Sequence, residues 1–74
     1  MKAAEFEMQC NFVHECANNL RACPRGEQIN EANILRTQLN ELLAAKLDRK
    51  NDRLQDRRVQ VMYLADQSLA ASGC

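Results

Sequence analysis

The side chains best suited to chemistry lie in the first third of the chain, which holds three of the four cysteines and the single histidine. Cys10 and His14 would face the same side of a helix, at a spacing that two metal ligands can use. Cys16 and Cys23 would share another face. Because the two pairs point about 120° or more apart around a helix axis, one tetrahedral site from a straight helix is implausible. No CxxC or HxxxH pair is present either, so we expect no metal site and no cofactor.

Catalysis by Cys10 and His14 would need further groups. A third side chain would have to orient the histidine, and a loop would have to form an oxyanion hole. Neither is visible in so helical a sequence, and we predict that the protein is not an enzyme and has no small-molecule substrate. We expect reduced thiols that act as small apolar core residues. Cys74 is expected to be an exposed, incidental thiol, with an intermolecular disulfide on oxidation as the alternative.

A second candidate for chemistry is the basic segment 46–58, which holds six of the ten basic residues of the chain. Its arginines could lie along phosphates, and a nucleic-acid-binding regulator is therefore the alternative function. The residues concerned are Arg49, Arg53, Arg57 and Arg58. Acidic residues are interleaved with them, aromatic residues are missing, and the whole chain has a net charge of zero. This pattern is more typical of a solvated helix face than of a nucleic-acid site.

The elements that position these residues are predicted from the helix breakers. Pro24 and Gly26 stand together, and the next glycine or proline is Gly73. The apolar residues are mostly Leu and Ala, which favours helix over sheet. We predict one small all-α domain over 1–74: a helical hairpin with a helix at about 3–22, a turn at 23–29 and a long helix at about 31–71.

The first helix carries two apolar stripes. The first has the alternating spacing of the a and d positions of a coiled coil: Ala3, Phe6, Cys10, Val13, Ala17 and Leu20. The second is narrower: Met8, Phe12, Cys16 and Cys23. One neighbouring helix would bury only one of these stripes. For the next helix, Asn30 is the predicted N-cap, with Ile29 and Ile34 as a hydrophobic staple.

The weakest part of the long helix is the segment 48–58. Its aspartates and its arginines each repeat at i,i+4, and such like-charge pairs are unfavourable in a helix. Asp52 and Gln55 could cap a new helix here. A break near 48–52 and a third helix, giving a three-helix bundle, is therefore the alternative. The uninterrupted apolar phase from Leu35 to Ala65 favours the continuous helix.

A continuous long helix would be about 60 Å long, against about 30 Å for the first. Its distal apolar stripe would then face water, and each exposed side chain would forgo about 1.5 to 3 kcal/mol of stabilisation from burial. The residues expected to bind a partner are Leu54, Val61, Leu64 and Leu69, with Met8 and Phe12 as a second patch. We predict a homodimer, antiparallel in the favoured arrangement, or a protein partner. A closed three-helix bundle would bury the stripe and remove this argument.

The function expected from these observations is a small protein-protein interaction module: an adaptor, inhibitor, co-chaperone or regulatory subunit. The acidic residues near the N-terminus come too early for a secretory signal, and no apolar run is long enough to span a membrane. We therefore expect a cytoplasmic protein without a membrane partner.

Overall fold

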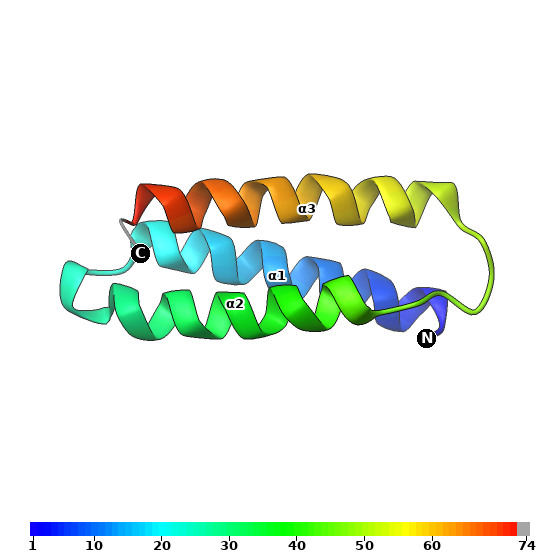
Figure 1. The fold of residues 1–74 in the computed structure, drawn as a ribbon, viewed down its shortest axis with the longest axis horizontal. Coiled ribbons are helices and arrows are strands. Elements are labelled where there is room, and N and C mark those ends of the chain that lie inside the picture. Colours follow the sequence, from blue (N-terminus) through cyan, green and yellow to red (C-terminus); the bar gives the residue numbers. More distant parts are fainter. Residues whose placement is uncertain (73–74) are drawn as a thin grey trace.

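Three helices form most of the computed structural model, which describes residues 1–72 (Figure 1). They are α1 (Ala3–Ala22), α2 (Gln28–Ala44) and α3 (Asp52–Ala71). In Figure 1, α1 and α3 run in the same direction and α2 runs opposite to both. Over the described part of the chain there is no strand, and no helix is both long and apolar enough to cross a membrane. The all-α prediction is confirmed.

The first connection forms where the helix breakers predicted it. Cys23 has extended backbone angles, as expected for a residue before a proline, and Pro24 leads into a short 3-10 turn at Arg25–Glu27. This turn continues directly into α2, which begins at Gln28 and not near residue 31. The prediction that Asn30 caps this helix is therefore wrong, because Asn30 already lies in its first turn.

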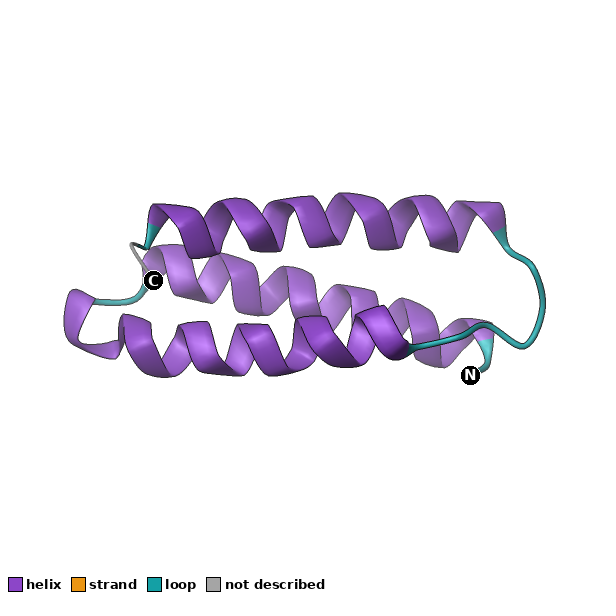
Figure 2. Ribbon diagram, in the orientation of Figure 1, coloured by secondary structure: helices purple, strands orange, loops and turns teal. Residues whose placement is uncertain are grey.

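The long helix predicted over 31–71 is wrong, and the alternative of a break and a third helix is right. The helix α2 ends at Ala44, and residues 45–51 form a loop that turns the chain around (Figure 2). Asn51 has an extended backbone and caps α3, since its Oδ1 accepts a hydrogen bond from the Leu54 N–H at 3.2 Å. Asp52 follows in the first turn, where a carboxylate suits the helix dipole.

The physical reason for the break is that folding back buries the distal stripe inside the same chain. Leu54 is 2% exposed and Val61 is 0% exposed, and both belong to the hydrophobic core. The helix α1 packs extensively against α2 and α3, whereas α2 and α3 touch each other over a much smaller surface. The buried apolar residues of α1 are Phe6, Cys10, Val13, Cys16, Ala17 and Leu20. Five of these six belong to the first predicted stripe, whereas Met8 and Phe12 of the second stripe stay exposed, so the two neighbours of α1 bury mainly its first stripe.

Arg58 ties the end of α2 to the other two helices. Its guanidinium donates to the Ala45 carbonyl oxygen at 3.1 Å and to Gln55 Oε1 at 2.6 Å. The same group lies over the Phe6 ring, 5.6 Å from its centroid, which is a favourable cation-π distance. One side chain of α3 thereby binds the carbonyl at the end of α2 and an aromatic ring of α1.

The break can be tested with proline at the first position of α3. We expect Asp52→Pro to change the free energy of unfolding by less than about 1 kcal/mol, because a first-turn N–H has no helical partner to lose. The preceding Asn51 already has the extended backbone that proline requires, with φ −145° and ψ 97°. Urea unfolding followed by far-UV circular dichroism measures the change.

The matched control is Asn40→Pro, at an exposed position inside α2. It should lower the free energy of unfolding by about 3 kcal/mol or more, because an interior proline removes a hydrogen bond and clashes with the preceding turn. A continuous helix through residue 52 would make the two variants equally damaging, and that result would contradict the fold described here.

Candidate functional site

The structure places Cys10 in the hydrophobic core. Its side chain is fully buried between the helices, and His14 one turn away is half-buried. Burial raises the pKa of the Cys10 thiol, although the nearby charges of Arg57 and Arg58 act in the opposite direction. No hydrogen bond joins Cys10 to His14 in the described residues, and no three metal-ligating side chains meet there.

The other two described cysteines also serve packing. Cys16 is buried, and Cys23 is half-buried with its Sγ donating to the Leu20 carbonyl oxygen at 3.2 Å. Burial raises the pKa of both thiols, and the nearby Glu31 carboxylate raises each further. Both are free thiols in the structure. Cys74 lies outside the described residues.

The four arginines of the alternative function do not share one face. Arg58 is directed into the bundle, and half-buried Arg57 donates to Asn11 Oδ1 of α1 at 3.2 Å. Arg49 is exposed in the loop, and Arg53 is exposed in the first turn of α3. Arg53 and Arg57 line a depression between α1 and α3 that also contains two carboxylates, those of Glu7 and Asp56.

The partner-binding residues expected on the distal stripe are mostly enclosed. Leu54 and Val61 lie in the core, and Leu64 and Leu69 are half-buried. The second predicted patch has the opposite environment, because Met8 is 70% exposed and Phe12 is 46% exposed. The predicted patch on α1 is therefore exposed, whereas the residues of the predicted distal stripe are mostly covered.

Met8 and Phe12 line a shallow groove between α1 and α2, here called the α1–α2 groove. Its lining residues are Met1, Glu5, Met8, Gln9, Phe12 and Gln38. Gln9 Nε2 donates to the Gln38 carbonyl oxygen at 3.2 Å and to Gln38 Oε1 at 3.0 Å. These hydrogen bonds join the two helices where they meet and satisfy polar groups beside an otherwise apolar surface.

Ile34 extends the same surface on α2. It precedes Gln38 by one helical turn, so the two side chains occupy one stripe, and it is 45% exposed. The sequence alone shows that Ile34 shares a helix face with Gln38, because the two residues are four positions apart. The pairing of Gln9 with Gln38 could not be found in this way, because it depends on how the two helices are aligned.

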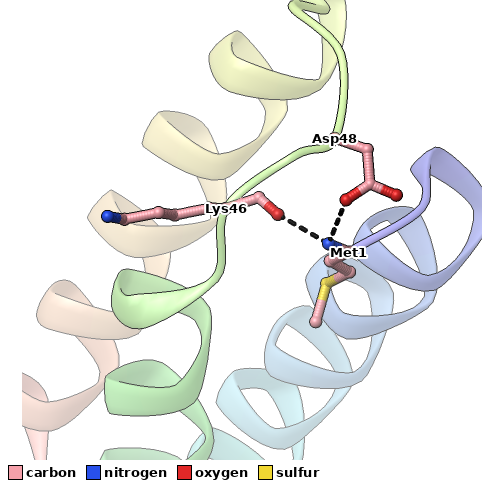
Figure 3. A network of polar contacts seen from close by, with 3 residues as sticks. All are labelled: Met1, Lys46 and Asp48. Atoms are coloured by element: carbon pink, nitrogen blue, oxygen red, sulfur yellow. Dashed lines mark hydrogen bonds and ion pairs between the residues drawn. The ribbon is translucent and has the colours of Figure 1, made fainter.

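Met1 reaches the groove because its α-ammonium group is bound by the loop 45–51 (Figure 3). The ammonium nitrogen lies 2.9 Å from the Lys46 carbonyl oxygen and 2.8 Å from Asp48 Oδ1. The Asp48 N–H in turn donates to the Met1 carbonyl oxygen at 2.9 Å. These three contacts fix the Met1 backbone beside the loop, and no local sequence signal predicts them.

Replacing the Asp48 carboxylate tests these contacts. We expect Asp48→Asn to lower the free energy of unfolding by less than about 1 kcal/mol, because the pair is partly exposed to water. The loss should shrink in about 1 M NaCl, where charge interactions are screened. Urea titrations at low and high salt measure it, with exposed Asp66→Asn as the control. An equal effect of the two variants would contradict a specific role for Asp48.

The cysteine environments predict an order of thiol reactivity. We expect Cys10 and Cys16 to react with iodoacetamide more slowly than Cys23, since the first two thiols are buried and Cys23 is only half-buried, so burial restricts access of the reagent to them. Peptide mass spectrometry after timed labelling measures the rates, with urea-unfolded protein as the reference. Protection of Cys10 no greater than that of Cys23 would contradict the core described here.

The raised thiol pKa values give a sign for the pH dependence of stability. The native thiols of Cys10 and Cys16 hold their protons above the ordinary pKa of 9.0, where unfolded thiols release them. Their contribution to stability should be complete below that pH and should be lost as the pH rises through the native pKa. Urea midpoints measured across this alkaline range should fall less steeply in Cys10→Ala than in the parent protein.

Comparisons of the chain with models of protein families, with curated proteins and with solved structures find no match. No function can be transferred from a relative on this basis. The surface chemistry of the bundle is therefore the basis for a functional proposal, and the α1–α2 groove brings two exposed apolar side chains, Met8 and Phe12, together on that surface.

Proposed function

We propose that the protein is a non-enzymatic interaction module that binds a protein partner through the α1–α2 groove. The observation that carries the proposal is that two exposed apolar side chains, Met8 and Phe12, line the same groove. Large apolar side chains that gather on a surface are typical of interaction sites. Methionine adapts to irregular partner surfaces, and aromatic side chains often provide much of the binding energy.

The groove also has features that suit recognition. Gln9 and Gln38 lie beside the apolar residues and hold the two helices at fixed spacing. Helical positions vary less than loop positions, so an incoming helix would meet a preformed surface. An adaptor, inhibitor, co-chaperone or regulatory subunit in the cytoplasm would need no more than such a surface.

A homodimer through the distal stripe has less support than binding through the groove. Leu54 and Val61 would have to leave the core before they could contact a second copy. A homodimer would therefore have to use another surface, and sedimentation equilibrium at high micromolar concentration measures whether one forms. The nucleic-acid alternative is weakened in a similar way, because Arg57 and Arg58 are already bonded to α1 and α2.

Site-specific photocrosslinking tests the proposed function. A photoreactive phenylalanine analogue at position 8 or 12 should crosslink to the same partner protein in the cells that naturally make this chain. The fold should tolerate both replacements, because Met8 and Phe12 are exposed. Gel electrophoresis and mass spectrometry identify the crosslinked product.

The control places the same analogue at Asp66, an exposed position on α3. Products shared by all three positions would be nonspecific. The proposal requires a product formed from positions 8 and 12 and absent from position 66. It fails if the groove positions give nothing beyond the α3 control while the protein is folded and expressed.

A further inference from the structure

The charged side chains on the two helices that form the α1–α2 groove are mainly acidic, and the Met1 ammonium group at the groove is paired with Asp48. The helices α1 and α2 together hold five glutamates and only two arginines. Glu5 lines the groove directly and is the charged side chain among its lining residues. A cationic partner would therefore be attracted to this surface.

Two further glutamates lie along the α2 side of the groove. Glu31, Ile34, Gln38 and Glu41 follow one another at intervals of three or four residues, so they occupy one stripe of the helix. Since Gln38 lies in the groove, its neighbours on this stripe border the same surface. Glu31 and Glu41 thus stand on either side of the exposed apolar Ile34.

The two arginines of these helices point elsewhere. Arg21 donates from Nε to Ser68 Oγ of α3 at 2.9 Å, away from α2. Arg36 is about 200° from Gln38 around the axis of α2 and contacts Asn33 Oδ1 at 3.4 Å. Neither arginine neutralises the glutamates beside the groove.

We infer that the α1–α2 groove binds a basic amphipathic helix of the partner protein. Apolar side chains of that helix would pack on Met8, Phe12 and Ile34, and lysines or arginines along its borders would face Glu5 and Glu41. This is the helix-in-groove mode of recognition, with anchors at i, i+3, i+4 and i+7. The inference rests on the proposed function and adds the chemical class of the partner.

The observations favour this occupant over a second copy of the chain. Two copies that met through the same groove would bring their glutamates together. The outer surface of α3 offers exposed Val59 and Tyr63, but aspartates accompany them on that helix. Among the described residues, α3 carries three arginines and three aspartates, and Arg57 and Arg58 are already bonded to Asn11 and Ala45, so this helix offers no basic border to a second copy.

Two designed peptides test the inference. Each is a helix of about four turns with leucines at i, i+3, i+4 and i+7 spacing. One has lysines along both borders of the leucines, and the other has glutamates there. We expect the lysine peptide to bind at least about tenfold more tightly than the glutamate peptide, with the difference shrinking as salt rises. Fluorescence anisotropy measures affinity, and amide chemical shifts locate the bound peptide.

Variants of the protein separate apolar from electrostatic recognition. Phe12→Ala should weaken binding of the lysine peptide about tenfold, because the substitution removes an exposed aromatic contact. The double variant E5Q/E41Q should lower the affinity for the lysine peptide about three- to tenfold and make that affinity less dependent on salt. The matched control D56N/D66N removes two negative charges from α3 and should leave the affinity within about twofold.

Failure of this inference can be told apart from failure of the proposed function. Equal binding of both peptides, absence of binding, or shifts on α3 would overturn the preference for a basic helix. If positions 8 and 12 still crosslink to a partner, the interaction function would remain and only the partner chemistry would be wrong. Absence of those crosslinks would overturn the interaction function itself.

Discussion

The rest of the structure depends on one constraint, which is that α1 has more apolar surface than one neighbouring helix can bury. Its buried residues include Phe6, Val13 and Cys16, and the helix contacts both α2 and α3. Two helices must therefore pack against it, and the chain has to reverse direction twice (Figure 1). The hydrophobic gain from burying α1 and the inner faces of both neighbours outweighs the entropy lost in ordering two connections.

The second reversal is held by polar contacts and not by a helix breaker. Arg58 binds the Ala45 carbonyl oxygen where α2 ends, and Asn51 caps the start of α3. The Met1 ammonium group binds Lys46 and Asp48 between these two points. The loop thus receives hydrogen bonds from residues distant in the sequence, which replace the helical hydrogen bonds given up at the break.

The closed bundle also determines which surface is available for function. Leu54 and Val61 are buried in the core, while Met8 and Phe12 remain exposed on α1 beside α2. Cys10 and Cys16 fill internal space, and the basic segment is divided between interior contacts and the loop. An apolar groove bordered by glutamates remains as the surface best suited to a partner.

The sequence by itself determined the helical content, the extent of α1, the turn at Pro24 and the two apolar stripes, because each follows from local propensity or helical spacing. It also identified Met8 and Phe12 as a separate patch. Tertiary structure decided whether residues 45–51 stay helical and which stripe faces water. The apolar phase from Leu35 to Ala65 fits both a continuous helix and two helices packed on one core. Only packing against α1 distinguishes them, since burial depends on contacts between residues far apart in the chain.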